Sequence, residues 1–431
     1  MMNYLNKFAD ENKLPVMDQQ QFETVTNDIG KEKFREDLAE YIATHRPKFP
    51  LKEISYEVMR QAFKSLQKQD VWEYVKPIEQ VEKNVKEKYD DYKYNFKDHG
   101  LGIIDAPSIF NDLSNYFHQH LRLNCSSFGF KAPKDVWENG TAKDIWRCLG
   151  PIWRGINGMK PVNINTGEKA ADGLPIYKEE LRGGVLNDKS YMSAFRLGTY
   201  IATQFKPNVA KTIYQMTNAK RVLDTSCGWG DRLAGFFTSD AEEYIGCDPN
   251  PNTYKQYLKQ VETYNSFLSK PKKVTIYNCG AEDLPWDKID NIDCAFTSPP
   301  YFSTERYNEG GEKEENQSWH KFDEYSKWRD DFYLPVAQKS FERSKHMFVN
   351  IMDPNIKNKR YYSSDELVDS LKDNFVGQIG MRIMQRPKSD KLFESEEEKA
   401  EFMNRIYIEN VWCFSKEKLD YFRHSRRATL F

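Results

Sequence analysis

The stretch KRVLDTSCGWGD, residues 220–231, joins a short apolar, β-branched run to a glycine-containing loop and to the start of a helix. A short apolar run bounded by turn residues is typical of a buried strand, so we predict a strand over 220–226. DRLAGFFTS, residues 231–239, predicts the helix that follows it. Gly228 and Gly230 permit a tight turn and a close approach of the backbone to a ligand. The stretch therefore favours a strand, loop and helix with a ligand at the carboxyl end of the strand.

The residues after this stretch repeat the alternation of short apolar runs and helix-like segments. Within 199–216 a helix is predicted once the chain has passed Pro207, and a second helix is predicted over 252–268. Further strands are predicted over 243–250, 273–280, 292–298, 346–353, 376–384 and 405–416. Strands that alternate with helices in this way form parallel sheets covered on both faces. We therefore predict an α/β fold with a Rossmann-like, doubly wound, mostly parallel sheet of seven strands.

The residues before about 185 follow a different pattern and predict a separate domain. YEVMRQAFKSLQ, residues 56–67, has the periodicity of a helix. Residues 71–98 are interpreted as a second helix, with a solvated face and with a Tyr and Val stripe that packs on the domain. Glycine, proline and asparagine are frequent over 155–184, which predicts loops or a linker. With ~150 residues as a typical domain size, we predict a mixed, largely helical N-terminal domain over 1–185 and a second domain over 186–431.

Composition excludes some classes of protein and leaves others open. Lys and Arg number 63 against 65 Asp and Glu, a formal net charge of −2, so no bulk basicity indicates nucleic-acid binding. The apolar runs are far shorter than the ~20 residues that cross a bilayer, so we expect no membrane span. Seven cysteines without a C-x-x-C pair, and an N-terminus without an apolar leader, predict reduced thiols and a cytoplasmic location, in a bacterium or an infected host cell. His118 and His120, two positions apart, would share one face of a strand, but no third ligand lies nearby, so we expect no metal.

An acidic residue and a second loop follow the next two predicted strands. Asp248 follows the glycine loop by about twenty residues, and its carboxylate can accept two hydrogen bonds from ribose hydroxyls. In CGAEDLPW, residues 279–286, the Ala281 N–H and the carboxylate of Glu282 or Asp283 can read an adenine edge. The chain has neither G-x-G-x-x-G nor G-x-x-x-x-G-K-[ST], which argues against a dinucleotide or a triphosphate. These features together predict a nucleoside-containing cofactor.

The motif TSPPYF, residues 297–302, decides the chemistry that we expect. Two consecutive prolines fix the backbone and remove two donors, so the carbonyls of Ser298 and Pro299 should face outward as acceptors. Acceptors around a planar amino group leave its nitrogen lone pair facing an electrophile. Tyr301 offers a flat face on which an aromatic ring can stack. The alternative is an ordinary rigid turn, which its position at the same sheet edge as the other motifs argues against.

With these motifs, residues 190–416 resemble the S-adenosylmethionine-dependent amino-methyltransferases, in particular the DNA N4-cytosine and N6-adenine enzymes. The resemblance implies the seven-stranded methyltransferase sheet, S-adenosylmethionine as cofactor and no metal. It implies catalytic roles for Ser298, Pro299, Pro300 and Tyr301. It implies cofactor binding by Phe205, Lys206, Pro207, Asp224, Ser226, Gly228, Gly230, Asp248, Pro249, Ala281, Glu282 and Asp283. Substrate binding is expected of Phe302, Arg306, Arg382 and Arg386.

The chain departs from that family in three ways. Gly280 stands where the family has an acidic residue before the adenine-reading alanine. The cofactor motifs precede the catalytic motif, whereas many S-P-P-Y enzymes have the reverse order. Only about fifteen residues follow the last predicted strand, so no C-terminal recognition domain is expected. Target recognition would then fall to residues 1–185, to the 302–320 loop, or to the basic 382–391 segment. The candidate phosphate contacts in that segment and in the tail are Arg382, Arg386, Lys388, Arg423, Arg426 and Arg427.

The resemblance implies transfer of a methyl group to N4 of cytosine or N6 of adenine in DNA, as in restriction-modification systems. The amino nitrogen of a flipped-out base would attack in line, helped by positioning and desolvation. A carbon-5 cytosine enzyme is excluded because its nucleophilic cysteine follows a proline, and the chain has no Pro-Cys. The alternatives are an RNA base, a glutamine side chain in a protein, or a non-catalytic nucleic-acid-binding protein on a methyltransferase scaffold.

Overall fold

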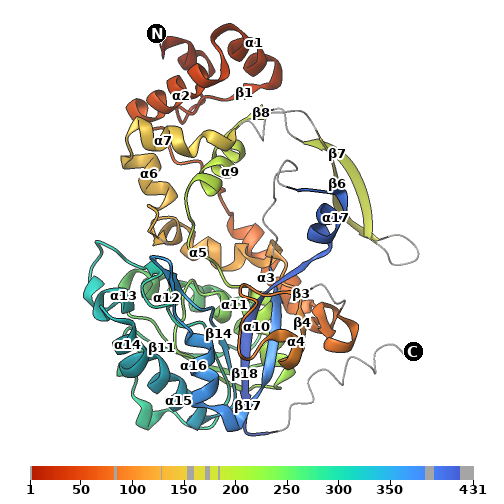
Figure 1. Ribbon diagram of the computed structural model, residues 1–431, viewed down its shortest axis with the longest axis vertical. Coiled ribbons are helices and arrows are strands. Elements are labelled where there is room, and N and C mark those ends of the chain that lie inside the picture. Colours follow the sequence, from red (N-terminus) through yellow and green to blue (C-terminus); the bar gives the residue numbers. More distant parts are fainter. Residues whose placement is uncertain are drawn as a thin grey trace. The chain divides into compact units, whose positions relative to one another are not determined.

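The computed structural model describes residues 2–81, 85–127, 129–152, 160–169, 175–182, 185–383 and 393–417 (Figure 1). These residues form two compact units, each described by itself. Unit 1 comprises Met1–Glu53 and Leu123–Ala202, and unit 2 comprises Ile54–Arg122 and Thr203–Phe431. The chain is therefore divided at other places than the single boundary that we predicted after residue 185.

Unit 2 is built on a sheet that contains all seven predicted strands. In spatial order, seven neighbouring strands are β11, β10, β9, β12, β14, β18 and β17. Their bounds are Arg221–Asp224 (β9), Glu243–Cys247 (β10), Lys273–Tyr277 (β11), Ile292–Thr297 (β12), Ser344–Asn350 (β14), Phe375–Arg382 (β17) and Ile406–Ser415 (β18). β9 to β12 and β14 pair in parallel, while β18 is antiparallel to β14 and β17. The predicted Rossmann-like, mostly parallel α/β fold is confirmed.

The strands of this sheet are apolar because both faces are covered. Successive residues of a strand point to opposite faces, and Val222 and Leu223 of β9 accordingly lie in two different core clusters. Phe296 shares the first cluster with Val222, and Ala295 shares the second with Leu223. Because the chain passes outward from β9 to β11 and then returns to β12 on the other side of β9, the order of strands reverses between β9 and β12. Ligands of open α/β sheets bind at such a switch point.

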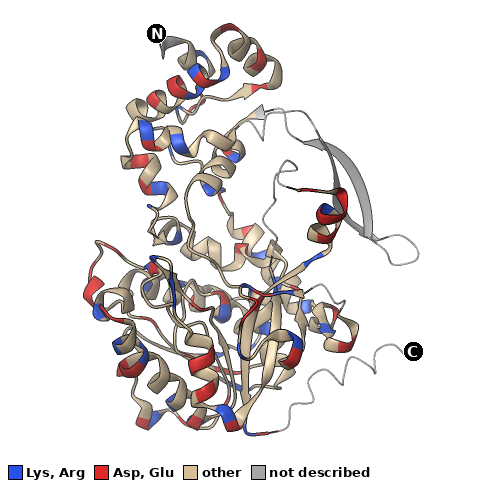
Figure 2. Ribbon diagram, in the orientation of Figure 1, with Lys and Arg blue, Asp and Glu red and all other residues tan. Residues whose placement is uncertain are grey.

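Helices cover the sheet on both faces. The first face carries α10 (Pro207–Met216), α11 (Asp231–Thr238) and α12 (Pro251–Asn265), whose apolar residues join the first cluster. The second face is covered by α14 (Tyr325–Lys327), the π-helix η9 (Trp328–Tyr333), α15 (Leu334–Arg343) and α16 (Ser363–Ser370). Short elements complete the connections: η6 (Ala281–Asp283), η7 (Trp286–Lys288), β13 (Glu305–Arg306), η8 (Glu314–Asn316), α13 (Ser318–Lys321), β15 (Asn355–Ile356), β16 (Lys359–Arg360), η10 (Lys372–Asn374) and α17 (Glu396–Asn404). Acidic and basic residues are interspersed on these helices (Figure 2).

Residues 54–122, which we placed in the N-terminal domain, belong to unit 2. The helices α3 (Tyr56–Lys68) and α5 (Asp112–Arg122) bury Phe63 and Phe117 in the same cluster as Val222. The sheet is extended by β4 (Gly100–Ile104), parallel to β17, and by β2 (Val75–Pro77), antiparallel to β4. The predicted helix over 56–67 is confirmed, but its apolar face packs on the helices α5, α11 and α12 of the second predicted domain, with Phe63 beside Tyr264.

Two local predictions in this segment are wrong. Residues 71–98 form no single helix: they contain η2 (Val71–Tyr74), β2, η3 (Ile78–Gln80), β3 (Val85–Lys86) and the start of α4 (Phe96–His99). Pro77 lacks an N–H and interrupts helical hydrogen bonding, whereas Tyr92 is buried, as expected for the Tyr and Val stripe of this segment. His118 and His120 lie on a helix, α5, not on a strand. Among the described residues, no group of three or more His, Cys, Asp or Glu side chains could hold a metal ion.

Unit 1 is largely helical. It contains α1 (Gln19–Ile29), α2 (Lys31–His45), α6 (Pro133–Asn139), α7 (Ala142–Cys148) and α9 (Asp188–Gly198), with the short helices η1 (Met2–Phe8) and η5 (Gly150–Ile152). Its core includes Phe34, Trp137 and Phe195. The 155–184 segment, predicted as loops, contains two antiparallel strands, β6 (Lys160–Lys169) and β7 (Pro175–Arg182). Turn-forming residues are also typical of hairpins, which explains the difference.

Two further expectations concern the chain as a whole. All seven cysteines are free thiols, as the absence of paired spacings predicted. Within the ranges that the structure describes, the helices are too short or too polar for any of them to pass through a lipid bilayer.

Lys211 of α10 joins α10 to α3 within unit 2, and its replacement should destabilise that unit. Its buried ammonium donates to the carbonyls of Leu66 and Gln69 at 2.6 and 2.8 Å, at the C-terminal end of α3. Lys211→Met leaves these buried carbonyls without a donor, so we expect the free energy of unfolding to fall by about 1–3 kcal/mol. Urea denaturation followed by circular dichroism measures this. Lys64→Met, on the exposed side of α3, is the matched control and should change stability by less than about 0.5 kcal/mol. Equal stabilities of the two variants would contradict the docking of α3 through Lys211.

Candidate functional site

Two adjoining cavities lie at the carboxyl ends of the parallel strands of unit 2. The first encloses about 710 Å³, including its opening to solvent, and is lined by the loops that follow β9, β10, β11 and β12. The second cavity has a volume of about 590 Å³, again including its opening to solvent. It is lined by residues 203–205, the glycine loop, part of 298–307, Asn350 of β14 and Glu409 of β18. Gly228, Trp229, Ser298 and Tyr307 line both cavities. The two cavities therefore meet where the glycine loop faces the S-P-P-Y motif.

The glycine loop has a conformation that requires glycine. Gly228 and Gly230 have φ angles of 57° and 73°, in the left-handed region. A Cβ atom on Gly230 would collide with the Gln260 side chain and would lie 2.9 Å from Nε2 of His118. The Gln260 amide donates to the Gly230 carbonyl at 2.8 Å, and its oxygen lies 3.1 Å from His118 Nε2. Close packing from α12 and α5 thus fixes the loop from behind.

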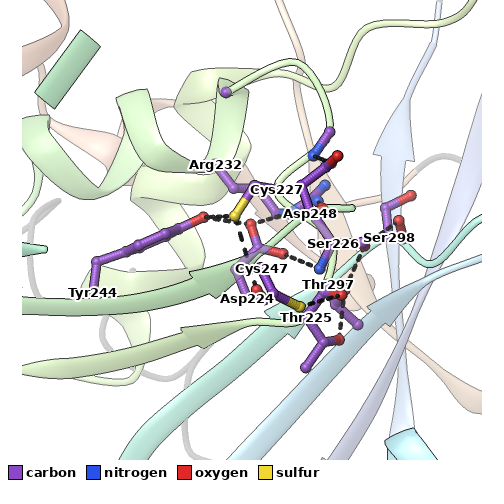
Figure 3. Close-up of polar contacts among 12 residues, drawn as sticks. Asp224, Thr225, Ser226, Cys227, Arg232, Tyr244, Cys247, Asp248, Thr297 and Ser298 are labelled. Carbon is purple, nitrogen blue, oxygen red and sulfur yellow. Dashed lines mark hydrogen bonds and ion pairs between the residues drawn. The ribbon is translucent and has the colours of Figure 1, made fainter. Parts of the chain in front are cut away.

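Asp224 supports the glycine loop from inside and lines neither cavity. Its fully buried carboxylate accepts hydrogen bonds from Arg232 Nε at 2.9 Å and from the Tyr244 hydroxyl at 2.6 Å (Figure 3). It also accepts the Ser226 N–H at 3.1 Å. Burial alone would lower the pKa of Arg232, but the charge of Asp224 more than offsets this and raises it. The pair therefore orders the loop, whereas the sequence suggested direct cofactor contact by Asp224.

Asp248 lines the first cavity, and its carboxylate is surrounded by donors. It accepts the N–H groups of Gly228 at 3.2 Å and Asn250 at 2.9 Å, and the hydroxyls of Thr253 and Tyr257, both at 3.1 Å. Each hydroxyl has a single proton and a second acceptor, the Asn250 carbonyl for Thr253 and the Gly228 carbonyl for Tyr257. Rotation of the two hydroxyls would free two acceptor positions on Asp248. Two is the number that the adjacent hydroxyls of a ribose need.

Burial raises the pKa of Asp248 to about 6, and the hydrogen bonds from its neighbours limit this rise. Asp231, which begins α11 and lines the second cavity, is fully buried and has its pKa raised to about 6 for the same reason. Both carboxylates are thus ionised at neutral pH and become protonated under mildly acidic conditions. Their charges sit at the two cavities rather than at the surface.

The S-P-P-Y motif separates the two cavities. Pro300 lines the first cavity, Pro299 and Tyr301 line the second, and Ser298 lines both. The Ser298 carbonyl, expected to face outward as an acceptor for the substrate, accepts a hydrogen bond from the Ser226 hydroxyl at 2.6 Å (Figure 3). The Tyr301 hydroxyl lies 3.4 Å from the Ser298 hydroxyl and donates to the Asn350 carbonyl at 3.3 Å. Burial raises the pKa of Tyr301, so its phenol remains protonated.

Three buried polar atoms near the first cavity have no partner within the described chain. They are Oε2 of Glu282, Nε2 of Gln317 and Oγ of Ser318. An acceptor, a donor and a hydroxyl of this kind suit a flat polar ring that carries both donors and acceptors. Asp283 does not line the cavity and lies 3.5 Å from Lys321 instead. Gln317 and Ser318 were missed from the sequence, although they belong to the polar loop after the S-P-P-Y motif.

The second cavity is acidic. Asp231, Glu305 and Glu409 line it, together with Arg232, whose charge is already paired with Asp224. The Gln204 amide donates to Asp231 at 2.9 Å, and the Ser114 hydroxyl also donates to it. These acidic residues, and Trp229, Tyr307 and Asn350, were not among the predicted site residues. Asp231 and Arg232 directly follow the glycine loop, a position that could have identified them; Glu305, Asn350 and Glu409 carry no such signal.

The remaining predicted residues divide into three groups. Phe205, Ser226, Pro249 and Ala281 line a cavity. Lys206, Pro207, Gly230, Phe302, Arg306 and Arg382 line neither. Phe302 packs in an aromatic cluster, Arg306 pairs with Glu309 at 2.8 Å, and Arg382 with Asp105 at 3.2 Å. The basic residues that lie outside the described chain are Arg386, Lys388, Arg423, Arg426 and Arg427.

Comparison with known proteins gives no close relative. No protein-family model and no curated protein sequence matches the chain. Solved structures that resemble it include a SAM-dependent O-methyltransferase from Thermotoga maritima (11% identity, 61% of this chain and 79% of that chain, TM-score 0.30). An rRNA methylase from Streptococcus thermophilus (11%, 50% and 100%, TM-score 0.30) and the N-terminal domain of EvdMO1 with SAH bound (9%, 54% and 85%, TM-score 0.31) are similar to the same degree. At these TM-scores the likeness decides neither fold nor function, so both depend on this chain's own strand order and site residues.

The packing behind Gly230 predicts that this position accepts no side chain. Gly230→Ala should lower the free energy of unfolding by about 1–3 kcal/mol more than Gly310→Ala, measured by urea denaturation. Gly310 is a matched control because its φ angle, 72°, is nearly that of Gly230, while a Cβ atom there meets nothing within 4 Å. Both variants share the backbone strain, and only Gly230→Ala adds the collision with Gln260. Equal losses in the two variants would show that the packing behind the loop is unimportant.

Proposed function

We propose that this protein transfers a methyl group from S-adenosylmethionine to an exocyclic amino group of a nucleic-acid base. The observation that carries the proposal is the position of Ser298, which lines both cavities. A cofactor in the first cavity and an acceptor in the second would meet at the S-P-P-Y motif. In the part of the chain that the structure describes, the sheet has ten strands rather than the seven expected, but the seven from β11 to β17, with antiparallel β18, agree with the resemblance on which the expectation was based.

The first cavity fits the adenosine part of the cofactor. Asp248 can release two acceptor positions for the ribose hydroxyls, as the partners of Thr253 and Tyr257 show. The unpartnered atoms of Glu282, Gln317 and Ser318 suit the polar edge of adenine, with Phe322 and Phe332 as apolar walls. The missing acidic residue at Gly280 is thus replaced by Glu282, two residues later. When bound, the cofactor supplies a methyl group made electrophilic by a sulfonium ion.

The second cavity fits the methionine part and the acceptor. The carboxylates of Asp231 and Glu305 suit the two positive charges of S-adenosylmethionine, the α-ammonium and the sulfonium. Tyr301 lines it and can stack a planar base, while the Pro299 carbonyl has no partner in the described chain and can accept from an amino group. A base within a duplex would have to leave the stack to reach this cavity, at a cost of a few kcal/mol.

The serine in the S-P-P-Y motif favours N4 of cytosine, or N6 of adenine, in DNA, because this form resembles that of many N4-cytosine enzymes. An RNA base is the second candidate, since its exocyclic amino group suits an S-P-P-Y site as well. Recognition of the target would fall to residues 1–185, of which 54–122 belong to unit 2, to the 302–320 loop, or to the basic 382–391 segment. A glutamine acceptor and a non-catalytic binding protein are outcomes that the experiment below distinguishes.

Transfer of a labelled methyl group to duplex DNA, single-stranded DNA, RNA and a glutamine-containing peptide, followed by mass spectrometry of the products, tests the proposal. We expect N4-methylcytosine or N6-methyladenine in DNA. Label in RNA alone would select the second candidate, and label in the peptide alone would replace a nucleic acid by a protein acceptor. Binding of S-adenosylmethionine without transfer would favour a non-catalytic protein, and absence of binding would reject the cofactor.

Asp248 predicts a pH dependence of cofactor binding. Only the ionised carboxylate offers two acceptors to the ribose, and its pKa is raised to about 6 by burial. We therefore expect an affinity that is constant above about pH 7 and falls as the pH decreases through 6, measured by calorimetry with S-adenosylhomocysteine. Asp248→Asn should bind about ten-fold more weakly at pH 7.5 and with less pH dependence. Asp287→Asn, at an exposed position, is the control and should match the wild type. An unchanged affinity of Asp248→Asn would remove Asp248 from the site.

A further inference from the structure

Glu409 is a carboxylate of the second cavity that comes from an unexpected place in the chain. It lies in β18, which runs antiparallel to β14. The register pairs Val411 of β18 with Asn350, the last residue of β14, so the residues just before Val411 lie at the carboxyl edge of the parallel strands. Glu409 and Asn350 consequently line the same cavity as Ser298 and Tyr301. Because β18 is antiparallel to β14, Glu409 lies in the same cavity as the S-P-P-Y motif.

Glu409 differs from the other two carboxylates of this cavity in its bonding. Asp231 accepts hydrogen bonds from Ser114 and Gln204, and Glu305 accepts the Thr203 N–H at 3.3 Å. The Glu409 carboxylate makes no hydrogen bond or ion pair with the part of the chain that the structure describes. Burial raises the pKa of Glu409, and the charges of Lys88 and Lys206 partly offset the rise. Glu409 is thus a cavity carboxylate with its acceptor positions available.

The proposed reaction needs a group of this kind. An amino nitrogen that gains a methyl group becomes positively charged unless it loses a proton. The groups of the S-P-P-Y motif are poor proton acceptors, because a hydroxyl and peptide carbonyls are far weaker bases than a carboxylate. Tyr301 already carries its proton, and burial raises the pKa of that phenol further. A carboxylate facing the amino group is the base that the motif itself lacks.

We propose that Glu409 accepts the proton that the acceptor's amino group releases, an assignment that rests on the proposed function. The nitrogen lone pair forms the bond to the methyl carbon, and the electrons of the broken carbon–sulfur bond stay on sulfur. The electrons of one N–H bond return to nitrogen as its proton moves to the Glu409 carboxylate. Solvent then removes this proton from Glu409. Before the transfer, the same carboxylate accepts a hydrogen bond from the amino group and holds it at the Pro299 carbonyl.

Two substitutions separate the proton transfer from the hydrogen bond. Glu409→Gln keeps the shape and one acceptor oxygen but cannot take a proton, whereas Glu409→Ala removes both functions. We expect single-turnover methyl transfer to fall by about 10²–10⁴-fold in both variants. Acceptor affinity in the presence of S-adenosylhomocysteine should be nearly unchanged in Glu409→Gln and about ten-fold weaker in Glu409→Ala. Formate, a small carboxylate, should restore part of the activity of Glu409→Ala and none of that of Glu409→Gln.

Calorimetry with S-adenosylhomocysteine supplies a readout independent of activity, and wild-type affinity in both variants shows that the fold and the first cavity are intact. Glu401→Gln, on the exposed helix α17 where Glu401 pairs with Arg405 at 2.6 Å, is the control with wild-type activity. Two outcomes would overturn the role of Glu409 while the proposed function stands. One is wild-type turnover in Glu409→Gln, and the other is loss of S-adenosylhomocysteine binding in both variants. Absence of methyl transfer by the wild type to every acceptor overturns the proposed function and this assignment with it.

Discussion

The buried ion pair between Asp224 and Arg232 is the constraint on which the site depends. It joins the end of β9 to α11, and the Tyr244 hydroxyl adds β10 to the same point. Removing one member of such a pair leaves an unpaired buried charge, at a cost of about 3–5 kcal/mol. The loop between the two residues is short, so once its ends are fixed its backbone has little freedom. The positions of Gly228 beside Asp248 and of Ser226 beside Ser298 follow from this pair.

The strands and the edge at which ligands would bind could be predicted because they depend on local patterns. Apolar runs, glycines at the turn and acidic residues at strand ends are all visible in the sequence. The contacts that each acidic side chain makes in the folded protein could not be predicted. Asp224 and Asp248 both follow a strand, yet one pairs with an arginine eight residues later and the other faces a cavity. The difference depends on which side of the loop the carboxylate points to, and no sequence pattern encodes that.

Residues that come from distant segments were missed for a related reason. Glu409 reaches the site only because β18 is antiparallel and has a particular register with β14. Gln317 and Ser318 come from a polar loop in which every residue could equally face solvent. The domain boundary was misplaced because an amphipathic helix such as α3 shows that one face is buried but not which elements of the fold bury it. The glycine-rich 155–184 segment lies inside unit 1 and does not mark its end.

The division of the chain has a consequence for how the protein folds during synthesis. The first part of unit 2, Ile54–Arg122, leaves the ribosome before Leu123–Ala202, and its partners in the sheet follow only afterwards. The apolar side chains that α3 and α5 pack against α12, such as Phe63 and Phe117 beside Tyr264, therefore remain uncovered until α12 is translated more than a hundred residues later. Contacts of such long sequence separation form slowly, and exposed apolar surface favours aggregation in the meantime. We expect nascent chains that end between residues 123 and 202 to bind chaperones that recognise apolar helices.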